Sequence, residues 1–154
     1  MSPARCHPGR AALFLLLILM ALPVWADNLL IVRTHQPLAS ALENLKRSIR
    51  EEGYDVARVD MVNIGLLGMG YTSSDYRAVF FGKAEELDEL SRNYPQLVPY
   101  LPLRIAVFSE GDSTLLVTVD PSTYREFLDG AGDSAIFDRW REEISAILSR
   151  MTNR

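Results

Sequence analysis

Arg104 is the side chain whose setting most suggests binding chemistry. It shares a strand phase with Ala106 and Phe108 inside the apolar run of residues 103–108. A buried arginine without a partner carries a large desolvation cost, so we expect its guanidinium to meet either a carboxylate of this chain or an anionic ligand. The carboxylates available for an internal ion pair are those of Asp120, Asp75 and Glu110.

A ligand site around Arg104 would draw on charged residues from neighbouring elements. Arg33 would add a second cation if its strand lies near that of Arg104. His35 ends the same strand as Arg33, where a pocket could open, and Asp120 lies at the far end of the hairpin that contains Arg104. The predicted ligand-binding residues are Arg104, Arg33, His35 and Asp120.

His35 also offers an alternative function. It could act as a general base with an Asp or Glu partner in a cofactor-free enzyme, or it could be a surface residue that only ends its strand. No G-x-S-x-G motif accompanies the serines, and the spacing of His, Cys and carboxylates does not fit a zinc site. The sequence therefore predicts no catalytic residue, no metal and no cofactor.

Three glycines, Gly65, Gly68 and Gly70, follow a predicted strand and could form a phosphate-binding loop. Their order, G-x-x-G-x-G, is not the dinucleotide fingerprint, and no Gly-Lys-Ser/Thr follows. We expect residues 63–75 to be a glycine-rich loop instead.

Residues 1–26 have the pattern of a secretory signal peptide. Arg5 and Arg10 precede an uncharged apolar run at residues 11–21, and Ala26 offers a small side chain at a cleavage position. Cleavage after Ala26 would place a chain without cysteine in the periplasm or outside the cell, with no membrane anchor. The acidic balance of that chain disfavours nucleic acid as a partner.

Apolar periodicity predicts a single two-layer α+β domain with a five-stranded, mixed but mostly antiparallel sheet. Because the strands around Phe80, Ile105 and Leu116 are apolar on both phases, we expect both sheet faces to be covered, the second by the terminal helix or by a second copy of the chain. The predicted strands are residues 28–35, 54–62, 76–81, 103–108 and 115–119. The predicted helices are residues 37–53, 83–93, one beginning at 120–121, and a strongly amphipathic one at 134–151.

Several segments in this order resemble the uncharacterised domain-of-unknown-function family 302. They are Glu51-Glu52-Gly53-Tyr54, the Tyr76 strand that closes on Gly82, Tyr100-Leu101-Pro102-Leu103-Arg104, and Asp120-Pro121. The resemblance covers residues 28–128 and implies a compact α+β domain with no established activity. Many members have a Cys-Asn-Pro-like segment where this chain has Phe81-Gly82-Lys83, so no thiol role carries over.

The expected organisation is a signal peptide at residues 1–26, the family-like domain at 27–130, and an added C-terminal helix at 131–154 packed on that domain. We interpret the chain as an exported, non-enzymatic module that binds a small anionic ligand or a protein partner. The alternatives are the His35 enzyme and a structural homodimer.

Overall fold

The structure is a computed structural model of the 154-residue chain, and it describes residues 28–72, 74–128 and 135–152. The predicted signal peptide, residues 1–26, lies outside the described residues. Within those ranges, no helix combines the length and the apolar character that crossing a membrane requires.

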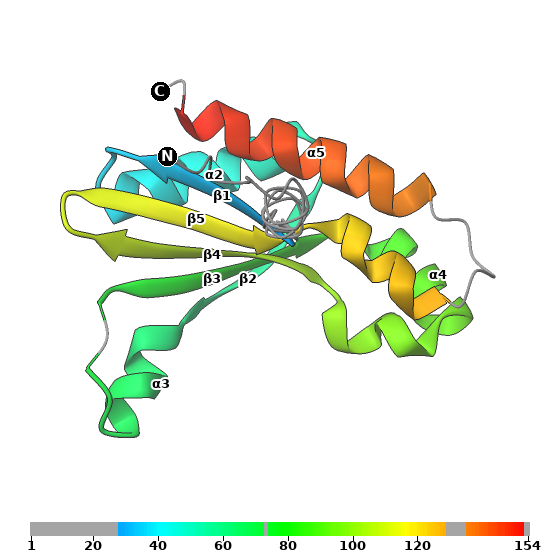
Figure 1. The fold of residues 1–154 in the computed structure, drawn as a ribbon, viewed down its shortest axis with the longest axis horizontal. Coiled ribbons are helices and arrows are strands. Elements are labelled where there is room, and N and C mark those ends of the chain that lie inside the picture. Colours follow the sequence, from blue (N-terminus) through cyan, green and yellow to red (C-terminus); the bar gives the residue numbers. More distant parts are fainter. Residues whose placement is uncertain (1–27, 73, 129–134, 153–154) are drawn as a thin grey trace, which may run out of the picture.

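A five-stranded open sheet forms the centre of the domain (Figure 1). Its order is β1-β5-β4-β3-β2, and every neighbouring pair is antiparallel. The strands are β1 Leu29–Thr34, β2 Asp55–Met61, β3 Tyr76–Gly82, β4 Leu103–Glu110 and β5 Ser113–Val119.

This arrangement confirms the α+β fold with helices packed on five strands, but the expectation of a mixed sheet is wrong. The reason is topological. Helix α2 (Leu38–Glu51) carries the chain across the sheet, so β1 and β2 run in the same direction but lie at opposite edges. Since three strands separate them, they cannot form a parallel pair.

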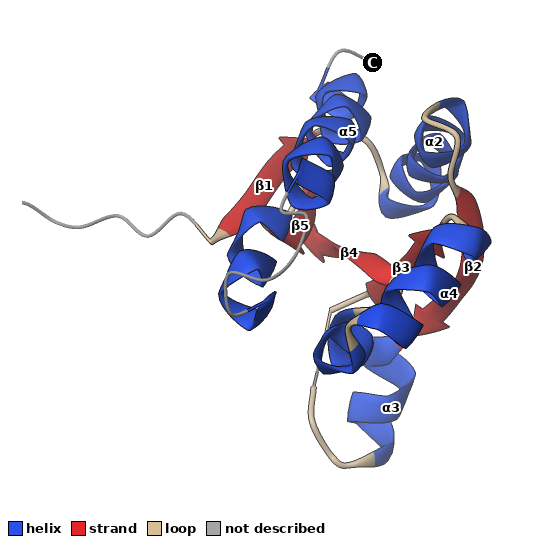
Figure 2. Cartoon of the chain, turned by 90° about the vertical axis from the view of Figure 1, so that its right-hand side faces the viewer, coloured by secondary structure: helices blue, strands red, loops and turns tan. Residues whose placement is uncertain are grey.

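Two helices, α2 and α5 (Ala135–Thr152), pack side by side on one face of the sheet (Figure 2). The predicted apolar stripe of the terminal helix is buried there, with Phe137 and Trp140 fully enclosed and Ile144 only 1% exposed. The two helices also share a hydrogen bond, in which Ser48 Oγ donates to the carbonyl of Ile147 at 3.1 Å. The predicted C-terminal amphipathic helix is therefore confirmed and is part of the core.

The second face of the sheet has neither α2 nor α5 packed on it. On β4, Leu103, Ile105 and Val107 are buried on the helix side, whereas Ala106 and Phe108, on the alternate phase, are only partly buried. Of the two alternatives for covering the second face, the terminal helix is wrong, because α5 packs beside α2 on the first face, and a second copy of the chain stays a prediction.

We call this second surface the open face. The strand pairing defines its residues as Leu29, Ile31, Arg33, Arg58, Asp60, Tyr76, Ala78, Phe80, Arg104, Ala106, Phe108, Leu115, Val117 and Val119.

Helix α3 (Val62–Gly68) replaces part of the predicted glycine-rich loop. The chain leaves the helix through Gly70, whose φ of 85° allows the N–H groups of Gly70 and Tyr71 to bond back to the carbonyls of Leu67 and Leu66. Glycines within a helix lower its stability but do not block it, so the glycine count was a misleading signal. None of the α3 residues is buried, and the helix extends away from the sheet (Figure 1).

A β-bulge in β2 changes which side chains reach the open face. The register shifts between Val56 and Arg58, so Val56 and Val59 both point toward the core while Arg58 and Asp60 point the other way. Simple alternation along residues 54–62 would place Val56 and Arg58 on one phase. The bulge therefore brings a charged pair to the open face that the sequence pattern did not predict there.

The remaining helices lie at one end of the sheet (Figure 1). They are α4 (Ala84–Asn93), the 3₁₀ helix η1 (Pro95–Tyr100) and the 3₁₀ helix η2 (Pro121–Leu128). Because η1 precedes β4 and η2 follows β5, these two short helices flank the same end of the open face.

A polar network fastens α4 and α5 to the end of α2. Tyr54, just after α2, donates a hydrogen bond to Glu143, and Lys83 Nζ lies 3.3 Å from the same carboxylate. Arg139 pairs with Glu86, which also accepts a 2.7 Å hydrogen bond from the Trp140 indole. Although burial alone would raise the pKa of Glu143, the hydrogen bond from Tyr54 and the charges of Arg139 and Lys83 lower it.

Replacing Glu143 with glutamine should reduce the free energy of unfolding by about 1–2 kcal/mol at neutral pH, because Tyr54 and Lys83 lose a charged partner. The folded-state pKa of Glu143 lies below its ordinary value of 4.5, so its stabilisation is present above that value and is lost as the pH falls through the folded-state pKa. Urea unfolding should therefore show that the difference in unfolding free energy between the wild-type and the Glu143→Gln protein becomes smaller at acidic pH.

The matched control is Glu142→Gln, which removes the same charge from an exposed neighbour on α5. It should leave the unfolding free energy nearly unchanged at both pH values. A Glu143→Gln effect as large in acid as at neutral pH would contradict the role assigned to this carboxylate.

Candidate functional site

Arg104 lies on the open face with no ion pair to any carboxylate among the described residues. Each of its three predicted partners binds a different arginine. The pairs are Asp120 with Arg141 at 2.8 Å, Glu110 with Arg33, and Asp75 with Arg77 at 3.7 Å. The Arg104 side chain is exposed, so its guanidinium remains available to an anion from solution.

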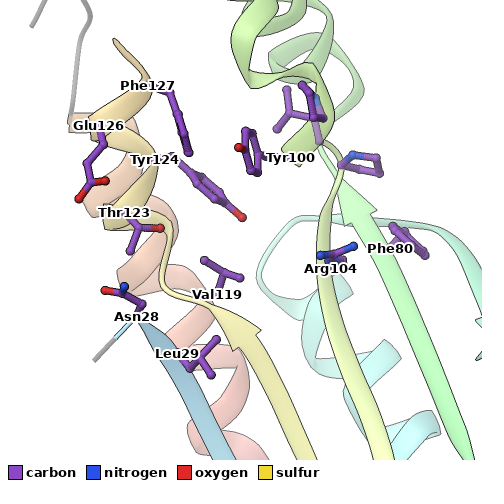
Figure 3. A pocket seen from close by; sticks show the side chains of 13 residues that line it. Asn28, Leu29, Phe80, Tyr100, Arg104, Val119, Thr123, Tyr124, Glu126 and Phe127 are labelled. Carbon is purple, nitrogen blue, oxygen red and sulfur yellow. The ribbon is translucent and has the colours of Figure 1, made fainter. Parts of the chain in front are cut away.

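A hollow of about 320 Å³ lies beside Arg104, where the open face meets η1 and η2 (Figure 3). Tyr100 on η1 stacks on Phe127 of η2 with ring centroids 4.5 Å apart, and Tyr124 lies 5.4 Å from Tyr100. We call this space the aromatic hollow. It is lined by Asn28, Leu29, Phe80, Pro99, Tyr100, Leu101, Pro102, Arg104, Val119, Thr123, Tyr124, Glu126 and Phe127.

Tyr124 adds a neutral hydrogen-bond donor close to the Arg104 charge. Its side chain extends from η2 toward the strand that carries Arg104 (Figure 3). Burial raises the pKa of the Tyr124 phenol, and the positive charge of Arg104 only partly opposes that rise. The hydroxyl therefore stays protonated at neutral pH and can donate to an anion beside the guanidinium.

Asp120 supports the aromatic hollow rather than lining it. The residue is 3% exposed, and its carboxylate caps the start of η2 by accepting a 2.9 Å hydrogen bond from the Ser122 N–H. The other carboxylate oxygen pairs with Arg141 on α5. Asp120 therefore fixes η2, and with it Tyr124, relative to the sheet and to α5.

A second hollow of about 370 Å³ continues from the first along the open face. The two share Leu29, Phe80, Arg104 and Val119, so Arg104 lies where they meet. Beyond the shared residues, the second hollow is lined by Asp60, Val62, Tyr76, Ala78, Ala106, Val117 and Thr118. Most of these side chains are apolar, so the continuation can hold an uncharged part of a ligand.

Arg58 is a cation near this site that sequence reasoning missed. Its guanidinium carbon lies 4.5 Å from the centroid of the Phe80 ring, and its Nη2 lies 3.1 Å from an Asp60 carboxylate oxygen. The β2 bulge turns Arg58 toward this face, and alternation alone could not predict a bulge. Because Asp60 already pairs with it, Arg58 is a weaker anion contact than Arg104.

The structure does not bring His35 or Arg33 to Arg104. Arg33 pairs across the sheet with Leu115, four residue pairs along β5 from the pairing of Val119 with Leu29, and its guanidinium contacts Glu110. His35 is exposed and lines a separate hollow with Asp75 and Asp112, near the turn between β4 and β5. A ligand-binding role for these two residues remains a prediction that concerns the other end of the sheet.

Two residues of the aromatic wall, Tyr124 and Phe127, were also missed, although their signal was present in the sequence. Tyr124 and Phe127 are three residues apart, so one helical turn presents both on one side of η2. The predicted hairpin places the segments before β4 and after β5 at one end of the sheet, but no pattern in the sequence indicated that Tyr100 would stack on Phe127 there. Among the described residues, no group of His, Cys, Asp or Glu is placed to hold a metal ion.

Comparison with known proteins gives a family and a fold. A family model described as "Domain of unknown function DUF302" matches residues 30–151, a range that includes most of α5 as well as the segments noted in the sequence. The crystal structure of an uncharacterised conserved DUF302 protein from Bacillus stearothermophilus aligns with a TM-score of 0.73 at 18% identity, covering 82% of this chain and 99% of that one. At this identity the likeness shows the fold alone. The comparison with curated proteins gave no match.

Replacing Asp120 with alanine should lower the free energy of unfolding by about 2–3 kcal/mol, because it removes the cap of η2 and leaves Arg141 without its partner. Chemical denaturation measures the change directly. The control is Glu110→Ala, which breaks the exposed pair with Arg33 and should cost at most about 1 kcal/mol. Equal losses in the two variants would contradict the supporting role of Asp120.

Proposed function

This chain belongs to the DUF302 family, a domain family of unknown function, and we propose that it is an exported, non-enzymatic protein that binds a small organic anion at Arg104. The observation that carries this proposal is the exposed Arg104 guanidinium, which has no carboxylate partner among the described residues and lies where two hollows of the open face meet.

The residues around Arg104 favour a carboxylate or a similar oxyanion as the charged group. A guanidinium presents parallel N–H donors that match two oxygens of one anion. The hydroxyls of Tyr100, Thr123 and Tyr124 and the amide of Asn28 line the same hollow and can complete the hydrogen bonding. Glu126 at the rim adds a negative charge, which disfavours ligands that carry several negative charges.

The rest of the ligand should be apolar. Tyr100, Phe127 and Phe80 present ring surfaces to the hollow, and Leu29 and Val119 extend that surface onto the sheet. Ring surfaces and aliphatic side chains gain free energy when an apolar group displaces water from them. An organic anion with an apolar body therefore fits better than an inorganic ion.

Binding fits the site better than catalysis does. His35, the residue proposed as a general base, lines a different hollow at the other end of the sheet from the aromatic hollow. The aromatic hollow instead combines one cation, neutral donors and apolar surface, which are the components of a recognition site. Export is inferred from the signal-peptide pattern of residues 1–26.

The test is a titration with benzoate by isothermal calorimetry, with neutral benzamide as the matched probe. Benzoate should bind more tightly than benzamide, and Arg104→Ala should weaken benzoate binding by roughly tenfold or more, since hydrogen bonds to charged groups contribute about 1.5–3 kcal/mol. Arg104→Lys should recover part of the loss.

The control variant is Arg92→Ala, which removes an exposed arginine on α4 that pairs with Asp88 and lines neither hollow. It should leave benzoate affinity unchanged. Equal affinity for benzoate and benzamide, or an Arg104→Ala protein that binds benzoate normally, would contradict the proposed function.

A further inference from the structure

We propose that the anion is amphiphilic, a monocarboxylate whose unbranched alkyl chain lies along the second hollow, over Ala78 and Ala106. This inference rests on the proposed function, because it takes Arg104 as the site of the carboxylate. It adds the chemical class of the ligand and the direction in which the ligand lies on the sheet.

The second hollow is a trough because small side chains lie between large ones. Ala78 and Ala106 are paired directly across β3 and β4, so two methyl groups form the floor at the centre of the open face. Two residue pairs away, Tyr76 and Phe108 contact each other edge to face, with ring centroids 6.1 Å apart, and close the far end. We call the surface between Arg104 and the Tyr76–Phe108 pair the alanine trough.

The near end of the trough is set by Phe80, which is paired with Arg104 across the same two strands. A chain that starts at Arg104 and runs along β4 therefore passes Ala106 and ends at Phe108. Those four residue steps span about 13 Å, at about 3.3 Å per residue. That length suits an extended alkyl chain, which needs no branching to fill a straight depression between neighbouring strands.

Charge fixes the orientation of the ligand in the trough. Arg104 is a cation with no carboxylate partner among the described residues, whereas the Asp60 carboxylate on the trough wall already pairs with Arg58 at 3.1 Å. The remaining walls, from Val117 and Val62, are apolar. One anionic end at Arg104 and an uncharged remainder match this distribution, while a second negative group in the trough would lie near Asp60.

The experiment compares butanoate, octanoate and dodecanoate, each below its micelle concentration, by calorimetric titration of the protein. Affinity should rise about two- to fourfold for each added methylene until the chain reaches Tyr76 and Phe108, and then level off. Arg104→Ala should weaken binding of all three by a similar factor, because each places its carboxylate at the same guanidinium.

A substitution that fills the trough distinguishes the contribution of the alkyl chain to affinity from that of the carboxylate. Ala106→Leu should weaken dodecanoate binding at least roughly tenfold while changing butanoate binding less than about twofold. The control, Ile31→Phe, adds bulk on the same face outside both hollows and should change neither affinity. If Ala106→Leu does not fold, Ala78→Val offers a smaller filling of the same floor.

A measurement on the unmodified protein gives an independent readout. With alanine methyl groups labelled for NMR, dodecanoate should shift the resonances of Ala78 and Ala106, and butanoate should shift them much less. Unshifted alanine methyls at saturating dodecanoate would overturn the inference.

The other outcomes are also decisive. Anions that depend on Arg104 but bind equally at every chain length would overturn the alkyl-chain inference and leave the proposed function standing. Binding of all chains without dependence on Arg104 would overturn both. Association with anionic lipid vesicles in place of monomeric dodecanoate, or a dimer that covers the trough and excludes every anion, would overturn the inference.

Discussion

The packing of α2 and α5 on one face of the sheet is the constraint on which the rest of the structure depends. Trp140 and Phe137 are fully enclosed against the core that Leu45 and Ile105 also build. Because both long helices pack on this face, they bury the strand side chains of one phase only. The other phase of β3, β4 and β5 nevertheless remains apolar, and this combination creates the open face.

The distribution of ion pairs gives the open face its chemical character. Asp120 binds Arg141 and Glu110 binds Arg33, so carboxylates that could have neutralised Arg104 are held elsewhere. Asp120 also caps η2, so a carboxylate that could have paired with Arg104 instead holds in place the helix that lines the aromatic hollow. A cation on an apolar surface has an unfavourable desolvation free energy unless water or a ligand satisfies its hydrogen-bond donors. The proposed binding function therefore depends on Arg104.

Local periodicity was enough to predict most of the fold. The stripe of Ile136, Trp140 and Ile144 predicted α5, and Gly53, with a φ of 83°, ends α2 as expected. The sequence could not show on which face of the sheet α5 would pack, since both phases of the central strands are apolar. Nor could it show the bulge near Arg58 or the stacking of Tyr100 on Phe127, because these depend on contacts between distant segments rather than on local pattern.

The most direct test of a bound organic anion is native mass spectrometry of the protein purified gently from the cells that produce it. Wild-type protein should carry a reproducible extra mass that is released by denaturation and is identified as a monocarboxylate with an apolar chain, and protein carrying Arg104→Ala should lack this mass. A wild-type chain that is always free of bound mass, or an adduct that persists in the Arg104→Ala protein, would contradict anion binding at Arg104.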